Sequence, residues 1–479
     1  MKVPAVIHAS DELLPNEDTL AEIETVAKQP GVFHHVTVMS DVHSKKGRKN
    51  PTGTVVASKF LMPQINDTAP NCGMRFLKTN LTDADLADGK LDELFNELVK
   101  VIPTKAYIGT AIPYSLVMDI CRLGLEPVTK YFQTRTKNEI ENTYKNCNFF
   151  RLEARLPNEQ DILNAIPKLF LKIGKYRFGI LGAAGNHFLD LMKITEIKNE
   201  EIAKKFGIQN GQYIFLMHTG SGLLGQYASY LYTPKNKEHL SQKIVLEIGK
   251  KLFKTKYKKE FNDLFKKIEE FRNKEEYFTY DKNSIIGQMF ITAHRVAGNH
   301  GFANRSILTH NLDLAIEKIL GKNPELELLY DKPHVYIDKE KHFGESVWVH
   351  RNGTVRANGP RRMNHPLFSQ TGEPIFLPSS MSTPAYLGVG TDENESTFFS
   401  ASHGTGRRKD PQNDKATDKQ QLIQKMQKKN VKLYNAKSKG VVLQDSGYYK
   451  DVEEVIAGMV ANKIIKTVAK MEPVAVLMY

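Results

Sequence analysis

Short apolar, β-branched runs alternate along the chain with longer amphipathic stretches, and several of the runs end at a histidine. Their composition predicts β-strands. The runs at 36–39, 213–217 and 346–349 lead into Asp41-Val42-His43, His218 and His350, respectively. Because strand ends and the adjoining loops hold side chains rigidly yet accessibly, these positions are candidates for a functional site.

Longer segments carry apolar residues at three- and four-residue steps, which predicts helices. One such pattern runs from Ile244 to Phe271 between lysines and glutamates. It lies within a charged helical excursion at about 234–280 that we expect to pack on the body by one face. Further helices are predicted from an N-cap at Ser284 through Ala293, from Leu312 to Leu320 and from Val455 to Met471.

Strands and helices together predict a mixed α/β (α+β) fold. No internal repeat, low-complexity linker or abrupt composition shift divides the 479 residues. The chemically suggestive blocks are spread from residue 41 to residue 450. We therefore expect one large compact domain, 1–479, in which strands carry the active site and helices lie at the periphery.

The chain is basic, with 67 Lys and Arg against 54 Asp and Glu and a formal net charge of +13. Such an excess attracts polyanions and favours RNA or DNA as a partner. A basic segment at 407–439 is either an electrostatic track for phosphates or a solvated helix face with loops.

Only three cysteines are present, Cys72, Cys121 and Cys147, and no CxxC pair occurs. A disulfide framework is therefore not expected. The first residues do not resemble a signal peptide, and no apolar run reaches the roughly 18 residues of a membrane span. These features predict a cytoplasmic protein with no membrane association.

Five short blocks place a histidine or cysteine among glycine, asparagine and serine. Such residues permit tight turns that bring backbone N–H groups close to a ligand, while imidazole or thiolate supplies metal ligation or nucleophilic attack. The blocks are Asn71-Cys72-Gly73-Met74, Gly185-Asn186-His187-Phe188, His218-Thr219-Gly220-Ser221, His350-Arg351-Asn352-Gly353 and Ser402-His403-Gly404-Thr405-Gly406-Arg407.

These blocks, together with His334 in the predicted strand that follows Pro333, suggest two kinds of chemistry. A cysteine and three histidines, Cys72, His187, His218 and His334, could hold a borderline-soft divalent ion, for which ligand chemistry alone suggests zinc first. Taken alone, His334 would be a strand histidine with no role. Around His403, glycines let a phosphate approach and the arginines that follow can hold its oxygens, so this histidine is a candidate nucleophile toward phosphorus.

In this order the blocks resemble those of the RtcB family of GTP-dependent RNA ligases, over roughly residues 36–460. The similar segments are Met39–His43, Cys72–Met74, Gly185–Asp190, His218–Ser221, Phe302–Arg305, His350–Gly353, Pro378–Met381, Ser402–Arg407 and Tyr449–Asp451.

The resemblance implies a single RtcB-like catalytic domain and a GTP- and manganese-dependent RNA ligase. It would join RNA 3′-phosphate or 2′,3′-cyclic phosphate ends to 5′-hydroxyl ends in RNA repair or tRNA splicing. His403 would form a histidine–GMP intermediate, and the GMP would pass to the RNA to give an RNA-ppG activated end. RNA bearing these ends is the expected partner; an activating protein partner is left open, and a monomer is expected.

The resemblance also implies roles for individual residues. Nucleotide contacts are expected from Asn186, Asp190, Ser380, Met381, Gly404, Thr405, Gly406 and Tyr449. Two manganese ions would be held by Cys72, His187, His218 and His334, and RNA phosphates by Arg351 and Arg407.

Three departures mark the chain as a divergent member. The family's metal-binding aspartate is Ala69 here, with Asp67 as a candidate replacement, and an arginine that usually follows the His-Ser-Gly-Ser block is Gly222. The family also tends to end in a lysine, whereas this chain ends in Tyr479. Two alternatives therefore remain: a metal-dependent cyclic phosphodiesterase, and a non-enzymatic factor that binds RNA ends.

Overall fold

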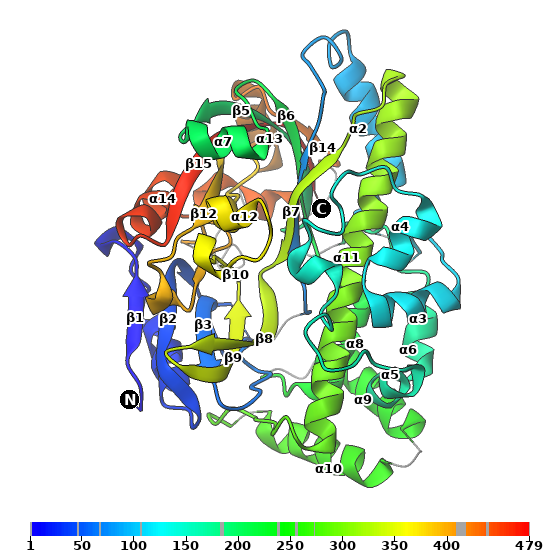
Figure 1. The fold of residues 1–479 in the computed structure, drawn as a ribbon, viewed down its shortest axis with the longest axis vertical. Helices are drawn as coiled ribbons and strands as arrows, with labels where there is room; N and C mark the ends of the chain where they lie inside the picture. Colours follow the sequence, from blue (N-terminus) through cyan, green and yellow to red (C-terminus); the bar gives the residue numbers. More distant parts are fainter. Residues whose placement is uncertain are drawn as a thin grey trace.

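Two β-sheets stand against a group of helices in the computed structural model (Figure 1). The structure describes residues 2–45, 47–66, 69–105, 108–182, 186–236, 240–253, 257–272, 274–408, 418–436 and 440–478. Within these ranges, the larger sheet has the strand order β11 (Pro374–Leu377), β12 (Ala385–Gly390), β15 (Ile465–Met478), β5 (Phe188–Ile197), β6 (Tyr213–Thr219), β4 (Gly73–Lys78) and β7 (Glu327–Pro333), with β14 (Lys432–Tyr434) beside β15.

The smaller sheet has the order β1 (Ala5–His8), β2 (Val32–His43), β3 (Thr52–Ser58), β9 (Glu345–Asn352) and β8 (Val335–His342). A short ribbon of β10 (Thr354–Arg356) and β13 (Ser400–Ser402) completes the described strands. Neighbouring strands are antiparallel except in the pairs β1–β2 and β14–β15. The three strands predicted to lead into histidines are confirmed as parts of β2, β6 and β9.

Helices gather mainly on one flank of the sheets, around the long helix α11 (Figure 1). Their bounds are α1 (Glu17–Ala27), α2 (Lys90–Val101), α3 (Tyr114–Leu123), α4 (Glu126–Phe132), α5 (Glu159–Ala165), α6 (Lys168–Gly174), α7 (Glu200–Phe206), α8 (Gly222–Tyr232), α9 (Leu240–Leu252), α10 (Lys258–Phe271), α11 (Ile285–Leu320), α12 (Phe368–Thr371), α13 (Lys419–Lys428) and α14 (Val452–Ala461). Short 3-10 turns lie at Asp11–Leu13, Tyr144–Cys147, Pro360–Arg362, Glu395–Thr397, Val441–Gln444 and Ser446–Tyr448.

Helix α11 corrects the prediction of two separate helices between Ser284 and Leu320. The N-cap is confirmed, because the Ser284 hydroxyl accepts a hydrogen bond of 3.0 Å from the Gly287 N–H. The chain then stays helical for 36 residues. Its glycines are weak helix formers, but a side chain at Gly298 would collide with the Phe149 ring and one at Gly301 with Asn71. Close packing therefore overrides local propensity.

The charged excursion packs on the body by one face, as predicted. Its single long pattern folds as two helices, α9 and α10. On α10, Phe261, Leu264, Phe265 and Ile268 are buried in the same apolar core as the middle of α11. The lysines and glutamates between them remain on the other face.

The predicted C-terminal helix from Val455 to Met471 is only half right. Helix α14 ends at Ala461, Lys463 takes a left-handed backbone angle (φ 54°), and β15 begins at Ile465. Strand β15 lies between β12 and β5 and has apolar neighbours on both faces. A strand buried on both faces forms a nearly continuous apolar run, which periodicity alone cannot separate from a helix.

The elements form a single compact mixed α/β body, which confirms the fold class predicted from the sequence. The larger sheet has an apolar core on each face: Phe76 and Met192 belong to one, Leu77 and Leu191 to the other. None of the helices in the described residues is long and apolar enough to cross a membrane.

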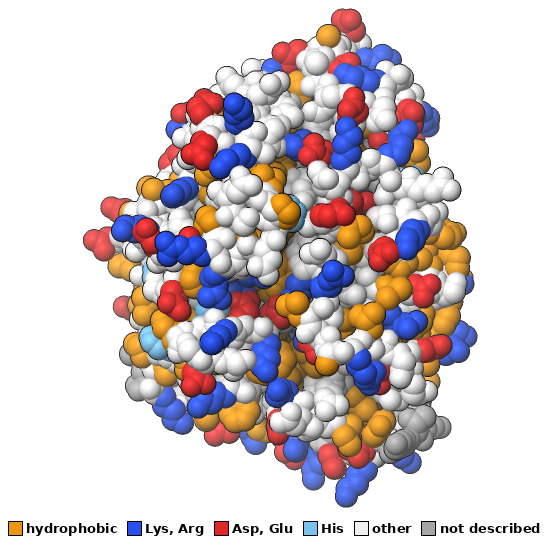
Figure 2. All heavy atoms as spheres, viewed as in Figure 1, with side chains coloured by type: hydrophobic (Ala, Val, Ile, Leu, Met, Phe, Trp, Pro, Cys, Tyr) orange, Lys and Arg blue, Asp and Glu red, His pale blue; other side chains and the backbone are white. Residues whose placement is uncertain are grey.

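Charged side chains of both signs are interspersed on the face of the molecule shown in Figure 2. The basic excess is therefore not collected into one broad patch on that face. Part of the predicted basic segment, 409–417 and 437–439, lies outside the described residues. The remainder contains α13, which buries Leu422 and Met426.

Candidate active site

A cavity of about 1170 Å³ opens where β2 of the smaller sheet faces β4, β5 and β6 of the larger one. It brings together blocks that are far apart in the sequence. Its lining includes His43, Lys45, Arg48, Met74, Asn186, Phe188, His218, Ser379, His403, Gly404, Thr405, Gly406, Arg407, Tyr449 and Lys450.

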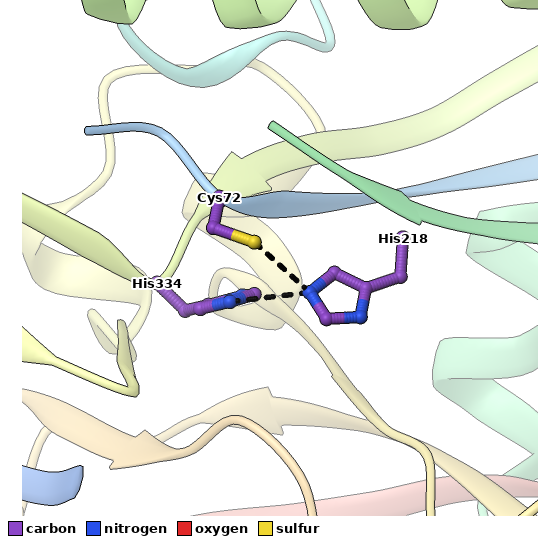
Figure 3. A group of neighbouring side chains, drawn as sticks. All are labelled: Cys72, His218 and His334. Atoms are coloured by element: carbon purple, nitrogen blue, oxygen red, sulfur yellow. Dashed lines mark hydrogen bonds between the residues drawn. The ribbon is translucent and has the colours of Figure 1, made fainter. Parts of the chain in front are cut away.

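A cluster of sulfur and nitrogen atoms lies at the base of this region. The Cys72 Sγ is 3.3 Å from the Nε2 atoms of both His187 and His218, and the His218 Nε2 is 3.3 Å from the Nε2 of His334. Cys72, His218 and His334 offer ligand atoms that all lie within 4.8 Å of one another. Figure 3 shows these three side chains converging from separate strands. The structure thus brings all four predicted metal ligands together.

Strand register explains this convergence. The larger sheet has the local order β5–β6–β4–β7, and His218 on β6 pairs with Phe188 on one side and Met74 on the other. His187 and Cys72 therefore stand at the ends of the two neighbouring strands. His334 directly follows β7, and its backbone N–H donates to the Cys72 carbonyl at 2.8 Å. Four adjacent strands thus position one candidate ligand each, His218 within its strand and the other three directly beside a strand end.

Backbone carbonyls fix the orientation of two of the imidazoles. The Nδ1 of His187 lies 2.9 Å from the Leu181 carbonyl, and the Nδ1 of His218 lies 2.7 Å from the Asn186 carbonyl. A carbonyl only accepts, so each Nδ1 carries the proton and each Nε2 keeps its lone pair. Outer hydrogen bonds of this kind hold ligating histidines in proteins.

The protonation states of the cluster suit metal binding. Burial lowers the pKa of His187 to about 4, so the ring is neutral, which is the ligating form. Burial raises the pKa of the Cys72 thiol to about 11. A bound divalent cation would reverse this effect and favour the thiolate. One sulfur and three imidazole nitrogens therefore fit a borderline-soft divalent metal ion.

Ala69 stands at the position where the family resemblance predicts a metal-binding aspartate. The Ala69 methyl faces helix α8, where a side chain at Gly225 would come within 3.1 Å of it. A methyl group cannot ligate a metal. The suggested replacement, Asp67, lies outside the described residues.

The candidate nucleophile His403 sits beside the cluster, just after β13. Its ring centroid is 4.5 Å from that of His334. Its Nδ1 lies 2.9 Å from Oδ2 of Asp41, a fully buried carboxylate on β2. The carboxylate accepts a hydrogen bond from the Nδ1–H group, so the Nε2 of His403 keeps the lone pair that a nucleophile needs.

The loop after His403 requires glycine at one position. Gly406 has a positive φ of 69°, and a Cβ there would lie 2.1 Å from the Asp41 carbonyl oxygen. The loop can therefore press against β2 only with glycine at this position. The Thr405 hydroxyl forms a 3.0 Å hydrogen bond with the Ser379 hydroxyl, which fixes the opposite side of the loop.

The other predicted nucleotide contacts fall into two groups. Asn186, Tyr449 and the three loop residues after His403 line the cavity. Asp190, Ser380 and Met381 are not among the lining residues. Met381 belongs to an apolar core, and Ser380 is bound to its neighbour Thr383.

Asp190 lies beneath the cavity. It is two residues along β5 from Phe188, which lines the cavity, so both side chains point to the same face of the sheet. Burial raises the pKa of Asp190 well above its usual value, and its Oδ1 has no hydrogen-bond partner in the described residues.

The two predicted RNA-binding arginines differ in placement. Arg407 lines the cavity, where its guanidinium lies 4.9 Å from the Tyr449 ring centroid and donates to the Leu443 carbonyl at 2.8 Å. Arg351 does not reach the cavity. Its side chain is fully buried, paired with Glu340 at 3.0 Å and bound to the Ser400 hydroxyl at 2.8 Å.

The prediction that Arg351 contacts RNA phosphate therefore has no support in the structure, because its guanidinium has no accessible face. We assign it a structural role, since it ties β9 to β13, the strand that leads into His403. A buried arginine and a phosphate-binding arginine cannot be told apart from a short sequence block.

Sequence reasoning named no role for several residues that shape the site. Asp41 belongs to a block that was noticed, but nothing in the sequence indicates its pairing with His403. Lys450 is also buried: its Nζ donates to the carbonyls of Ser40 and Val42 at 2.8 and 2.9 Å, on either side of Asp41. The cavity-lining residues Lys45 and Arg48 were likewise missed. Their signal is the basic run Ser44–Lys49, which directly follows the predicted strand at 36–39 and its Asp41-Val42-His43 block.

A buried ionic network holds the metal-ligand loops. Arg305 on α11 pairs with Asp331 at 2.7 Å and donates to the Thr219 carbonyl at 2.8 Å. It also donates to the side-chain oxygen of Asn71 at 2.8 Å. One guanidinium thus connects the residues that adjoin Cys72 and His218. Arg75 binds the same aspartate from β4 at 2.8 Å.

Comparison with known proteins agrees with this geometry. A family model described as tRNA-splicing ligase RtcB matches residues 22–478. The tRNA-splicing ligase RtcB of Nanoarchaeum equitans is 30% identical to this chain, covering 100% of the chain and 95% of the relative. That of Methanococcus maripaludis is 29% identical with the same coverage. RNA-splicing ligase RtcB homolog 1 of Entamoeba histolytica is 28% identical over 94% of the chain and 82% of the relative. Because the family model spans nearly the whole length, the chain belongs to the RtcB family.

Proposed function

We propose that the protein is a GTP- and manganese-dependent RNA ligase that joins RNA 3′-phosphate or 2′,3′-cyclic phosphate ends to 5′-hydroxyl ends. The observation that carries this proposal is the position of His403. Its Nδ1 is held by Asp41 at 2.9 Å, and its ring lies against His334 of the Cys/His cluster. A candidate nucleophile for phosphorus thus stands next to a candidate metal site at one cavity, which supports the proposal.

The first step would be attack of the His403 Nε2 on the α-phosphorus of GTP. A nitrogen–phosphorus bond forms, the bond from that phosphorus to the bridging oxygen breaks, and pyrophosphate leaves. The proton stays on Nδ1 in its hydrogen bond to Asp41, and the Asp41 carboxylate balances the positive charge that develops on the ring. Gly404, Thr405 and Gly406 would hold phosphate oxygens through the loop backbone, because their turn lines the cavity.

The second and third steps transfer the GMP. An oxygen of the RNA 3′-phosphate attacks the same phosphorus, and the bond to His403 breaks to give the RNA-ppG end. The RNA 5′-hydroxyl then attacks the 3′-phosphorus, releasing GMP and a proton and forming the phosphodiester. A 2′,3′-cyclic phosphate would first be opened by hydrolysis.

The guanosine would lie toward Asn186 and Tyr449, with the tyrosine ring stacked on the base. Asp190 would face it from below, and Ser380 and Met381 would support the wall behind Ser379. Arg407 would hold an RNA phosphate. Cys72, His187, His218 and His334 would hold manganese, which when bound neutralises phosphate charge and polarises the phosphorus under attack. We expect cytoplasmic activity in RNA repair or tRNA splicing.

The test is labelling of the purified protein with α-labelled GTP and manganese, followed by denaturing electrophoresis. We expect an acid-labile labelled band in the wild type that is lost in His403→Ala. His310→Ala is a matched control, since this histidine on α11 is not among the cavity-lining residues and should keep the band. Absence of the band from metal-loaded wild-type protein would overturn the proposal.

The loss of the aspartate at Ala69 favours one second candidate, a metal-dependent cyclic phosphodiesterase. Such an enzyme would convert 2′,3′-cyclic ends to monophosphates without GTP. End joining that requires GTP would exclude this as the main activity.

A further inference from the structure

The loop between β2 and β3 carries a concentration of basic side chains that the proposed function has not used. Its sequence, Ser44–Asn50, contains Lys45, Arg48 and Lys49 among its described residues. Lys45 and Arg48 line the same cavity as His403 and Arg407. The lining has an excess of cations, because Lys45, Arg48, Arg407, Arg408 and Lys450 face three carboxylates, Glu12, Asp18 and Glu22. On the face shown in Figure 2, charges of both signs are interspersed.

The loop is fixed at both ends, so these cations have defined positions. The Ser44 hydroxyl donates to Glu22 on α1 at 2.8 Å and forms a second 2.8 Å hydrogen bond with Thr19. At the other end the Asn50 amide donates to the Ile65 carbonyl and to the Thr54 hydroxyl.

A tight turn lies between these ends. The Arg48 N–H donates to the Lys45 carbonyl at 2.9 Å, and Gly47 has a positive φ of 81°. In a β-turn the first and fourth residues come close together. The turn therefore gathers Lys45 and Arg48 at one wall of the cavity.

Lys45 is electrostatically coupled to the reaction centre. Its ammonium is repelled by Arg48 and Arg407 and attracted by the Asp41 carboxylate. The Lys45 Nζ makes no hydrogen bond or ion pair with the described part of the chain, although it lies near like charges. An incoming anion would relieve this repulsion, which is the usual property of a phosphate subsite.

We propose that Lys45 and Arg48 form, with Arg407, an oxyanion subsite that holds the pyrophosphate of GTP first and the RNA 3′-phosphate afterwards. This inference rests on the proposed function and assigns a site within it. Attacking and leaving groups in phosphoryl transfer lie roughly in line across the phosphorus. Pyrophosphate therefore leaves on the side opposite the His403 Nε2, and the RNA 3′-phosphate must attack from that same side.

One subsite can serve both steps because the two anions share their chemistry. Each presents phosphate oxygens that accept charge-assisted hydrogen bonds from ammonium and guanidinium groups. Departure of pyrophosphate would free the subsite for the RNA end. Because the two anions would occupy the subsite in turn, the cations of the subsite have a role in addition to that of the loop at Gly404–Gly406.

The experiment measures binding, not turnover, with the full-length protein. The probes are two short RNAs of the same sequence, one ending in a 3′-phosphate and one in a 3′-hydroxyl, and in a second arm inorganic pyrophosphate as competitor. We expect the wild type to prefer the 3′-phosphate RNA. Lys45→Ala should reduce that preference by roughly 10- to 100-fold, without changing affinity for the 3′-hydroxyl RNA. Pyrophosphate should compete with the 3′-phosphate RNA in the wild type and only weakly in the variant.

Two further variants make the result specific. Lys45→Arg keeps the charge and should retain most of the preference. Lys49→Ala removes the same charge from the same loop, but Lys49 donates to the Glu276 carbonyl at 2.6 Å and is not among the cavity-lining residues, so the preference should persist.

An unchanged 3′-phosphate preference in Lys45→Ala, or an equal loss in Lys49→Ala, would overturn the inference. Neither outcome touches the proposed function, which is judged separately by the His403 labelling. If wild-type protein is not labelled, the proposed function fails even where the 3′-phosphate preference is found.

Discussion

The Oδ2 atom of Asp41 accepts a 2.9 Å hydrogen bond from the Nδ1 of His403, across 362 positions of sequence. Asp41 is fully buried, and Lys450 binds the backbone carbonyls on either side of it. The carboxylate thus has little freedom to move. It sets which nitrogen of His403 carries the proton, and so which nitrogen would be the nucleophile in the proposed reaction.

Asp41→Asn should therefore impair formation of the His403–GMP intermediate more than GTP binding. The amide can present its NH₂ group to the imidazole, which favours the tautomer with the proton on Nε2. We expect the labelling rate to fall by roughly 10²- to 10⁴-fold, because the nucleophilic lone pair is lost. Rapid-quench labelling with α-labelled GTP measures this rate. A rate within about twofold of the wild type would contradict the role given to Asp41.

Cys72→Ala should abolish binding of the metal that Cys72 shares with His218 and His334. Loss of an outer-shell partner alone weakens metal affinity by roughly 10- to 100-fold, so loss of a direct ligand should cost at least as much. Titration of the metal-free protein with manganese gives the affinity and stoichiometry. Cys121→Ala is the matched control, because Cys121 is buried in the helical core and should leave metal binding unchanged.

Gly406→Ala should destabilise the nucleophile loop. The new methyl would lie 2.1 Å from the Asp41 carbonyl oxygen, and the residue must also keep a φ of 69°. Gly344→Ala separates the two effects, since Gly344 has a φ of 82° but no atom within 4 Å of the added methyl. We expect about 1 kcal/mol of destabilisation at Gly344, from backbone strain alone. Gly406→Ala should lower the free energy of unfolding by clearly more than this, and it should also slow the labelling of His403 by GTP. Equal unfolding free energies for the two variants would show that the loop relaxes freely.

Asp331→Asn should weaken both the fold and the metal site. Asp331 is fully buried and neutralises Arg305 and Arg75, so its loss leaves two buried guanidinium groups short of a partner. Breaking a buried ion pair on one side costs about 3–5 kcal/mol. Denaturant unfolding measures this cost, and manganese titration should show a weaker affinity because Arg305 no longer fixes the loops beside Cys72 and His218. If the Asp331→Asn protein were less stable but still bound manganese tightly, the network of Asp331, Arg305 and Arg75 would contribute to folding and not to metal binding.

Much of the site could be predicted from the sequence because its chemistry is local. Cys72, His187 and His218 each adjoin glycine or small polar residues, and His218 also ends an apolar run, so these three blocks are visible without a structure. His403 is marked in the same way by the glycines of its loop. Strand ends in a sheet then bring these blocks together.

What the sequence could not supply depends on distant partners. Nothing local pairs Asp41 with His403, or shows that Arg351 is buried against Glu340. The middle of α11 contains weak helix formers that only packing keeps helical. Strand β15 has apolar neighbours on both faces, so its pattern imitates a helix. In each case a tertiary contact overrides the local signal.

The last prediction concerns the pH dependence of folding stability and involves Glu340. Burial alone would raise its pKa, but the charge of Arg351 and hydrogen bonds from His342 and Arg351 hold it well below the usual value of 4.5. A carboxylate whose pKa is depressed on folding contributes stability that is present above its unfolded pKa. That stability is lost as the pH falls through the folded pKa.

Glu340→Gln should therefore lower the unfolding free energy by about 3–5 kcal/mol near pH 7, because Arg351 is left buried without its counter-charge. The difference between wild type and variant should shrink as the pH falls below about 4.5, where the wild type begins to lose the same contribution. Urea unfolding from pH 7 to pH 3.5 measures both. Glu270→Gln, at an exposed position on α10, should change stability by less than about 0.5 kcal/mol at every pH. A difference at Glu340 that stays constant across this range would mean that the carboxylate acts through its shape and hydrogen bonds, and not through its charge.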